Sequence, residues 1–316
     1  MKAVLYRRLG GPEVLEYTDV PEPVIGHRQL LLRVHATAVN PVDWKFRKGT
    51  PRIPFLPLPR IPGSDIAGEI VRVGTSVTRF QSGEAVYGML SPLSSRGGCA
   101  EFAAVPEGNV ARKPKNLSFV EAAAVPLAGL TALKALRDLG RIARGQAVLI
   151  NGASGGVGSF AVQIARLYGA EVTAVTSRKN LEFVRTLGAH HAIDYATEDF
   201  TAAPSRYDII VDAVGNRSFG RCRAALRPGG IYLSTLPALS TVLGMVAGPL
   251  LGGKRARLVN LWPNGKELEQ LTAWIEAGQL RPQIDRVLPL AKTAEAHALS
   301  EAGHARGKIV IDVMGR

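Results

Sequence analysis

A glycine-rich segment carries the clearest chemical signal in the chain. It reads Gly152-Ala153-Ser154-Gly155-Gly156-Val157-Gly158 and follows the apolar run 147–151 (AVLIN). Glycines let a backbone turn sharply and approach a pyrophosphate without a Cβ clash, and a following helix offers free N–H groups at the positive end of its dipole. The segment therefore predicts a turn between a strand and a helix that binds the pyrophosphate of a dinucleotide.

The same residues leave a second interpretation open. Positions 152–156 also fit the G-x-S-x-G pattern that exposes a nucleophilic serine in one class of hydrolases. Asp212 and then His297 or His304 follow in the order that such enzymes use. A nucleophile turn has no need of the further glycine at position 158, whereas a pyrophosphate turn uses it, so the dinucleotide interpretation is favoured.

The segment after the next predicted strand indicates which dinucleotide is bound. The run 171–176 (EVTAVT) leads into Ser177-Arg178-Lys179-Asn180. A carboxylate at this point binds the ribose 2′-hydroxyl of NAD, whereas a hydroxyl and two cations attract a 2′-phosphate. Ser177, Arg178 and Lys179 therefore predict NADPH.

These segments lie in a chain whose pattern changes along its length. Residues 1 to about 115 read as short strands separated by turns, with many prolines between 51 and 62. From position 147 onward, apolar strands alternate with helices, which indicates a parallel, doubly wound sheet. The strands predicted in this part are 147–151, 171–176, 207–212 and 230–234. The fold class is α/β, with a β domain in front of the parallel sheet.

Composition excludes several classes of protein. The chain has 316 residues and a net charge of +13, but its cations are scattered rather than interleaved with aromatics, so we expect no nucleic-acid partner. Two cysteines rule out a disulfide framework and a four-cysteine zinc site. The most apolar window, 236–251, is short and broken by Pro and Gly, so no membrane span is expected. We predict a cytoplasmic protein.

Short motifs spread over the whole chain resemble one family. They are Asn40-Pro41-Val42-Asp43, Pro62-Gly63-Ser64-Asp65-Ile66-Ala67-Gly68, Ala128-Gly129-Leu130-Thr131, the glycine turn, Asp212-Ala213-Val214-Gly215 and Gly303-His304-Ala305-Arg306-Gly307-Lys308. In order and spacing the chain is similar to the zinc-independent medium-chain dehydrogenases/reductases of the quinone oxidoreductase type. Many of those have Tyr where this chain has Lys45, and the lysine form resembles the alkenal/enone reductase branch.

The resemblance implies a domain organisation and the absence of a metal. A GroES-like catalytic domain would span 1–116, a Rossmann NADPH-binding domain 117–262, and a C-terminal segment, 263–316, would return to the catalytic domain. Zinc-dependent relatives carry a histidine where this chain has Ser64 and a cysteine in the segment matching Asn40 to Asp43. Because softer ligands are missing at these positions, no metal is expected.

The resemblance also places residues around the cofactor. Thr131 would hold the nicotinamide amide, helped by the backbone near Val214-Gly215 and Ser234. The remaining positions carried over are Ser154, Gly155, Gly156 and Val157 at the pyrophosphate, and Tyr195, with Ser177 and Lys179, at the ribose and its 2′-phosphate.

The predicted reaction is hydride transfer from NADPH to a quinone or an α,β-unsaturated carbonyl. Without a metal, the negative charge that grows on the acceptor oxygen must be met by hydrogen-bond donors. Asn40 and Lys45 are the predicted catalytic residues, acting in chemistry or in positioning the cofactor. The alternatives are an NADPH-dependent binding or sensing protein without turnover and, behind it, the serine hydrolase. We expect a homodimer, with the segment 257–261 (RLVNL) as a possible edge.

Overall fold

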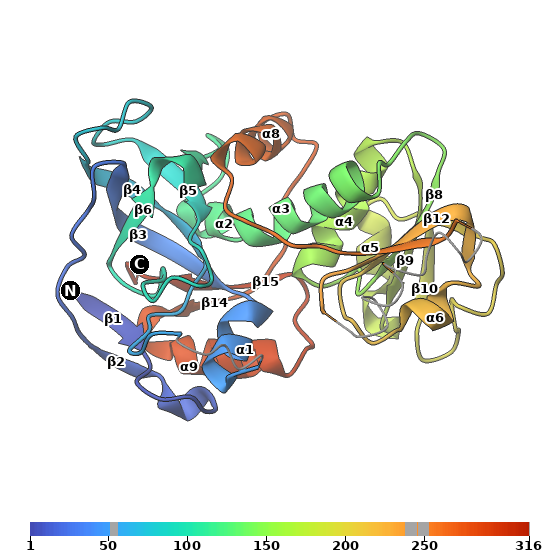
Figure 1. Ribbon diagram of the computed structural model, residues 1–316, viewed down its shortest axis with the longest axis horizontal. Coiled ribbons are helices and arrows are strands. Elements are labelled where there is room, and N and C mark those ends of the chain that lie inside the picture. The colour runs from blue at the N-terminus through green and yellow to red at the C-terminus, as the bar shows by residue number, and fades with distance from the viewer. Residues whose placement is uncertain (51–55, 238–244, 246–252, 316) are drawn as a thin grey trace. The chain divides into compact units, whose positions relative to one another are not determined.

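The chain folds into two compact units. The computed structural model describes residues 1–50, 56–237, 245 and 253–315. One unit comprises Met1–Leu127, Trp262–Gly278 and Pro282–Arg316, and the other comprises Ala128–Leu261 with Gln279–Arg281. Figure 1 follows the chain by colour through both. The domain boundaries after residues 116 and 262 stay a proposal.

The first unit is built on an almost wholly antiparallel sheet. Its strands are β14 (Ile284–Pro289), β15 (Lys308–Asp312), β3 (Gln29–Val39), β4 (Asp65–Val73), β5 (Ala85–Met89) and β7 (Val110–Arg112), in that order, with β6 (Phe102–Pro106) also paired to β3. Only β14 and β15 run parallel to each other. A separate hairpin pairs β1 (Lys2–Leu5) with β2 (Glu16–Asp19). The C-terminal strand β15 therefore lies directly beside β3, near the start of the chain.

Helix α1 (Pro41–Lys48) follows β3 at once because the sequence encodes both of its ends. Asn40 caps its N-terminus in a capping box with Asp43, and Pro41 supplies the fixed φ angle of a first helical residue. Gly49 ends the helix at a φ of 72°, in the left-handed region. Helix α9 (Thr293–Glu301) lies beside α1, and Arg47 forms an ion pair with Glu301 (Figure 1).

Two further helices complete the first unit. Helix α2 (Phe119–Ala123) begins at Ser118, whose hydroxyl accepts from the N–H of Glu121. Helix α8 (Gly265–Glu276) begins at Asn264, whose side chain accepts from two backbone N–H groups. Helix α3 (Pro126–Leu133), most of which belongs to the second unit, continues as a π-helix over Lys134–Leu139.

The second unit contains the predicted parallel sheet. Its order is β10 (His191–Asp194), β9 (Glu171–Thr176), β8 (Ala147–Asn151), β11 (Tyr207–Asp212), β12 (Leu226–Ser234) and β13 (Arg255–Leu258). Every neighbouring pair is parallel. Asn151 pairs with Asp212, and Asp212 pairs with Ser234, so the carboxyl ends of these strands meet at one edge. That edge is where ligands of open α/β sheets bind.

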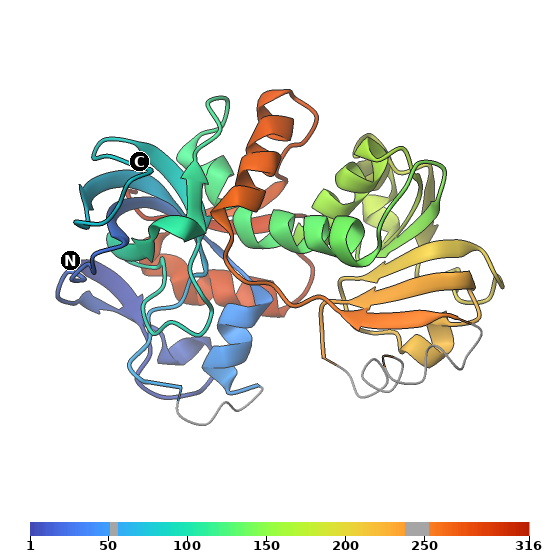
Figure 2. The same cartoon turned by 45° about the horizontal axis from the view of Figure 1, so that its top comes forward.

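Helices α4 (Gly156–Leu167), α5 (Leu181–Thr186) and α6 (Phe219–Cys222) connect these strands. The turn predicted over the segment 152–158 is shorter than expected, because helix α4 begins at Gly156 and includes Gly158 in its first turn. Strand β13 ends the sheet and lies beside β12 (Figure 2). Pairing of two copies along this edge stays a prediction.

Two regions singled out in the sequence fall largely outside the described residues. They are most of the apolar window 236–251 and the start of the proline-rich stretch 51–62. Among the residues that are described, no helix is both long and apolar enough to cross a membrane.

Candidate functional site

The glycine turn of the second unit is folded tightly against β9. The N–H groups of Gly152 and Ala153 donate to the carbonyl oxygen of Val175, at 3.1 and 3.0 Å. Gly152 has a φ of +78°, which a residue with a side chain rarely adopts. A Cβ on Gly158 would lie 2.1 Å from the carbonyl oxygen of Gly152. The first and last glycines are therefore required by backbone geometry.

Helix α4 starts directly from this turn, and no side chain caps it. Gly155 is the N-cap residue and has no side chain, and among the described residues no side-chain cap hydrogen bond is made there. Uncapped N–H groups at a helix N-terminus form an anion-binding site. The predicted pyrophosphate residues Ser154, Gly155, Gly156 and Val157 form this corner.

The hydroxyl of Ser154 ties the turn to the end of the next strand. Its oxygen accepts from Thr176 Oγ1 at 2.7 Å and from Asn180 Nδ2 at 3.2 Å. Asn180 Nδ2 also lies 3.2 Å from Ser177 Oγ, so one buried amide links the pyrophosphate turn to the predicted ribose segment. The sequence pattern had not singled out Thr176 or Asn180 as functional, although Asn180 directly follows the predicted cations.

The two cations predicted to bind the ribose 2′-phosphate lie directly after β9. Arg178 and Lys179 follow β9 and are exposed. Tyr195 follows β10, has 54% of its surface exposed, and donates its N–H to the carbonyl oxygen of Thr176 at 3.2 Å. The ends of β9 and β10 thus bring together a tyrosine and two cations next to the Ser154 turn.

Asp212 shapes the neighbouring loop. Its Oδ1 accepts from the backbone N–H groups of Val214 at 3.0 Å and Gly215 at 2.8 Å, and from Asn151 Nδ2 at 2.9 Å. Its Oδ2 accepts from the Tyr232 hydroxyl at 2.8 Å. Burial, followed by the charge of Asp212, raises the pKa of Tyr232. Asp212 therefore holds the backbone predicted to lie near the nicotinamide.

The contacts of Ser154 and Asp212 argue against the hydrolase interpretation. The Ser154 hydroxyl bonds to a threonine and an asparagine, and Asp212 bonds to an asparagine, a tyrosine and two backbone groups. A catalytic triad needs a histidine between serine and carboxylate. No hydrogen bond among the described residues connects either side chain to one.

Thr131 and Ser234 are the two remaining side chains predicted to lie near the nicotinamide. Thr131 lies in α3 and is 6% exposed. Ser234 ends β12, and its hydroxyl donates to the carbonyl oxygen of Leu236 at 2.9 Å. Their roles toward a nicotinamide stay predictions.

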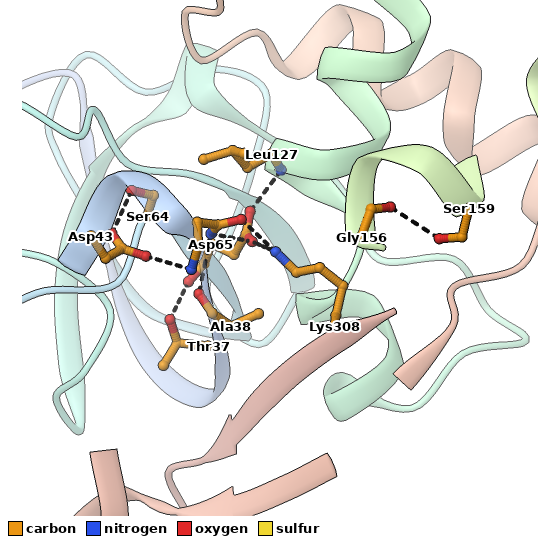
Figure 3. Close-up of polar contacts among 10 residues, drawn as sticks. Thr37, Ala38, Asp43, Ser64, Asp65, Leu127, Gly156, Ser159 and Lys308 are labelled. Carbon is orange, nitrogen blue, oxygen red and sulfur yellow. Dashed lines mark hydrogen bonds and ion pairs between the residues drawn. The ribbon is translucent and has the colours of Figure 1, made fainter. Parts of the chain in front are cut away.

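In the first unit, Asn40 is held by a buried cation and a buried carboxylate. Its Nδ2 donates to Asp65 Oδ2 at 2.8 Å and to the carbonyl oxygen of Ala38 at 3.2 Å, while its Oδ1 accepts from Lys308 Nζ. Figure 3 shows the Lys308 side chain reaching toward Asp65. Because an ammonium only donates, it fixes which way the amide faces. Both N–H bonds of the Asn40 side chain are therefore engaged within the protein.

Asp65 and Lys308 form the centre of this cluster. In the sequence, both residues stood out only as members of family motifs. Lys308 Nζ lies 3.0 Å from Asp65 Oδ2, and their side chains are 4% and 0% exposed. Asp65 Oδ1 also accepts the N–H of Leu127 at 2.7 Å (Figure 3). Each charge opens a strand and is followed by three uncharged residues, which are 66–68 in β4 and 309–311 in β15, and this pattern is the signal that could have identified them.

A second carboxylate, Asp43, lies next to the cluster. Its Oδ2 accepts from the Asn40 N–H at 2.8 Å, and its Oδ1 accepts from the Ser64 hydroxyl at 3.0 Å (Figure 3). Burial, partly opposed by the Asn40 hydrogen bond and reinforced by the charge of Asp65, raises the pKa of Asp43 to about 6. Ser64, noted in the sequence only for replacing a histidine, is thus the hydrogen-bond partner of a carboxyl whose pKa is raised to about 6.

Lys45 stands apart from Asn40 although both belong to α1 or its cap. Its Nζ lies 5.5 Å from the centre of the Trp44 ring. Burial lowers the pKa of the Lys45 ammonium. No hydrogen bond joins Lys45 to Asn40 in the described part of the chain, and the catalytic roles of both residues stay predictions.

Possible metal ligands are scattered. Within residues 1–50, 56–237, 245 and 253–315, no group of three or more His, Cys, Asp or Glu side chains is arranged to hold a metal ion. Both cysteines, Cys99 and Cys222, are buried. Burial raises the pKa of the Cys222 thiol to about 12.

One unit has a parallel sheet of the dinucleotide-binding type and the other is a β unit with buried polar side chains, a combination typical of two-domain dehydrogenases and reductases. Comparison with known protein families supports this class. Residues 26–115 match the alcohol dehydrogenase GroES-like domain, and residues 187–311 match the family described as zinc-binding dehydrogenase.

Individual relatives indicate the group within this family to which the chain is most similar in sequence and structure. The chain is 37% identical over 325 residues to a chloroplast envelope quinone oxidoreductase homolog of Arabidopsis thaliana, covering 99% of this chain and 98% of that protein. It is 36% identical to the NADPH-dependent alkenal/one oxidoreductase of the same plant, covering 98% of this chain and 79% of the relative. The quinone oxidoreductase structure from Coxiella burnetii matches with a TM-score of 0.89 and 33% identity, over 99% of both chains.

The chain belongs to the medium-chain dehydrogenase/reductase family, in the group of quinone oxidoreductases and alkenal reductases. The family, the fold class and the enzyme class predicted from the sequence are confirmed. The predicted cofactor, NADPH, agrees with the NADPH dependence named for the alkenal/one relative. Relatives are named as chloroplastic or mitochondrial, so the cytoplasmic location stays a prediction.

Proposed function

We propose that this chain is an NADPH-dependent reductase that transfers a hydride to a quinone or an α,β-unsaturated carbonyl without a metal. The observation that carries the proposal is the pyrophosphate turn joined through Asn180 to a ribose segment with two cations and no carboxylate. Two relatives named for quinones and for alkenals support the acceptor class.

The second unit holds the residues that would bind the cofactor. The uncapped N–H groups at the start of α4 suit the pyrophosphate, while Arg178, Lys179 and Tyr195 suit a phosphorylated ribose. The loop fixed by Asp212 presents its backbone toward the strand edge where a nicotinamide would lie. When bound, NADPH supplies a hydride from C4 of its nicotinamide.

The first unit would supply the groups that stabilise the negative charge developing on the acceptor. As hydride arrives, negative charge grows on the acceptor oxygen and is stabilised by nearby donors and cations. Because both amide N–H bonds of Asn40 are engaged, we assign Asn40 the role of holding Lys308 in place. Lys45, whose pKa is lowered by burial, remains our candidate for a donor to the acceptor.

The experiment is to mix purified protein with NADPH and a panel of enones, quinones and saturated ketones, following loss of the reduced nicotinamide absorbance. We expect turnover with quinones or enones and none with saturated ketones, because reduction of a saturated ketone forms an alkoxide that needs a metal or a strong acid. Turnover confined to saturated ketones contradicts the proposal. Tight NADPH binding without any turnover favours a binding or sensing protein instead.

A further inference from the structure

One buried amide, the side chain of Asn180, lies between two serine hydroxyls at the edge of the parallel sheet. Asn180 is 7% exposed, and its Nδ2 lies 3.2 Å from both Ser154 Oγ and Ser177 Oγ. The two serines come from different segments, the glycine turn and the residues that follow β9. Because both oxygens contact one nitrogen, they lie close enough to each other to bind the same phosphate group.

The hydrogen-bond donors around Ser154 leave only its own proton for a ligand. A hydroxyl has one proton to donate and two lone pairs that accept. Ser154 Oγ accepts from Thr176 Oγ1 at 2.7 Å and from Asn180 Nδ2 at 3.2 Å, so both lone pairs are occupied. Among the described residues no acceptor takes the Ser154 proton, and Ser154 is partly exposed. Ser154 is therefore a donor toward a ligand that reaches it.

The same amide orients Ser177. This serine is the N-cap residue of the short 3₁₀ turn Arg178–Asn180, a position at which a serine oxygen commonly accepts from backbone N–H groups, but its side chain makes no such bond. Its oxygen accepts from Asn180 Nδ2 instead, and no group in the described part of the chain takes its proton. Both hydroxyls thus receive an N–H from Asn180 and keep their own protons for a ligand.

Two cations without an acidic partner adjoin this pair of hydroxyls. Arg178 and Lys179 directly follow Ser177, are exposed, and form no ion pair with another described residue. A phosphate dianion only accepts hydrogen bonds, whereas a ribose hydroxyl also has a proton of its own to place. Two hydroxyls held as donors beside two cations therefore favour a phosphate over a hydroxyl.

We propose that Asn180 is a positioning residue that selects the phosphorylated cofactor, because its amide turns the hydroxyls of Ser154 and Ser177 outward and both donate to the 2′-phosphate of NADPH. This moves Ser154 from the pyrophosphate, where the family resemblance placed it, to the 2′-phosphate. The pyrophosphate is left to the backbone N–H groups at the start of α4. The inference rests on the proposed function, since it takes NADPH as the cofactor, and it involves residues of the second unit alone.

Binding of two cofactor fragments tests this role without any turnover. Adenosine 2′,5′-bisphosphate carries the 2′-phosphate and adenosine 5′-monophosphate lacks it, so the ratio of their affinities isolates the contribution of that phosphate. Each fragment is titrated into the purified full chain, and the heat of binding is measured. The wild type should bind the bisphosphate at least about tenfold more tightly than the monophosphate.

Three single variants remove the amide or one of the hydroxyls. Asn180→Leu keeps the branched shape without the N–H groups, and we expect the bisphosphate to bind about tenfold more weakly and the monophosphate to change by less than about twofold. Ser154→Ala and Ser177→Ala should show the same selective loss. The matched control Asn116→Leu removes an amide of the first unit, whose Nδ2 donates to the carbonyl oxygen of Ile275 at 2.8 Å, and should leave both affinities unchanged.

A double-mutant cycle separates positioning from any other role of Asn180. In the Ser154→Ala/Ser177→Ala chain, Asn180→Leu should weaken bisphosphate binding by less than about twofold further, because no hydroxyl remains to be oriented. A further tenfold loss in this background overturns the assignment, since Asn180 would then act without the serines.

Other results overturn the inference in different ways. Equal weakening of both fragments by Asn180→Leu would mark a purely structural residue, and tighter bisphosphate binding would mean that the amide oxygen had turned the hydroxyls inward. Unchanged bisphosphate affinity in Ser154→Ala returns that serine to the pyrophosphate. If the wild type does not prefer the bisphosphate, the NADPH assignment fails and the inference falls with it. If it does, but no acceptor is reduced in the turnover assay, the proposed reaction fails and the role of Asn180 stands.

Discussion

The glycine turn and the Asn40 cluster differ in what holds them together, which is backbone geometry in the turn and polar or charged side chains in the cluster. The turn is one continuous segment, 152–158, whose shape comes from its backbone and from the hydrogen bonds of Gly152 and Ala153 to Val175. The cluster consists of side chains from Asn40, Asp65 and Lys308, separated along the chain by 25, 243 and 268 positions. Substitutions should therefore damage the turn through steric overlap and the cluster through unbalanced charge.

The largest effect is expected in the cluster, from Lys308→Met. It leaves the carboxylate of Asp65 buried without its cation, and breaking a buried pair in this way costs about 3–5 kcal/mol of the free energy of unfolding. Urea denaturation measures it, with Lys179→Met, an exposed lysine, as the matched control. The double variant Asp65→Asn/Lys308→Met should recover part of the loss. A loss below about 1 kcal/mol contradicts a charge-balanced cluster.

Gly158→Ala tests whether the turn requires the close approach of α4 to the backbone of Gly152. Its new Cβ would lie 2.1 Å from the carbonyl oxygen of Gly152, so backbone must shift, at about 1–3 kcal/mol of unfolding free energy. Gly155→Ala is the matched control, because its Cβ would lie at an ordinary 3.4 Å from the same oxygen. Equal stability of the two variants in thermal unfolding contradicts the required close approach of α4.

The pH dependence of stability should distinguish two buried groups of the first unit. The pKa of Asp43 is raised to about 6, so its contribution to stability is full below the ordinary value of 3.8 and is lost as pH rises through 6. Burial, then the Arg47 charge, lowers the pKa of His297 to about 3, so its contribution is full above 6.5 and is lost as pH falls toward 3. Each effect is at most about 1.4 kcal/mol per pH unit.

Between pH 4 and 6 these two contributions oppose each other. Stability of Asp43→Asn should therefore rise more steeply with pH than that of the wild type, and stability of His297→Leu should rise less steeply. Denaturation curves at several pH values measure the slopes. Equal slopes of stability against pH for all three proteins contradict the shifted pKa values of both groups.

The smallest effect on the fold, and the most selective one on binding, is expected from Lys179→Glu. Lys179 is exposed, so stability should change by less than about 0.5 kcal/mol. NADPH should bind about tenfold more weakly, because a carboxylate now faces its 2′-phosphate, while NADH binding should change little. The matched variant Lys115→Glu, which reverses a charge in the first unit, should leave both affinities as they are. Equal weakening of both cofactors by Lys179→Glu contradicts the ribose assignment.

The two regions also differ in how far the sequence predicts them. The turn, the parallel sheet and the segment after β9 were predictable because each signal lies within a few consecutive residues. The end of the turn was not predictable, because glycines that favour a turn also form the first residues of α4, and packing against Gly152 decides between the two conformations. The roles of Asp65, Lys308 and Ser64 were not predictable, because strand order in the sheet brings β15 beside β3.

One titration tests the central claim that the glycine turn and its neighbouring cations bind a phosphorylated dinucleotide. The purified wild-type chain is titrated with NADPH and, in parallel, with NADH, and the fluorescence of the nicotinamide is followed. We predict saturable binding of NADPH, at least about tenfold tighter than that of NADH, since a charge-assisted phosphate contact contributes more than 1.4 kcal/mol. Equal affinities, or tighter binding of NADH, would contradict the claim.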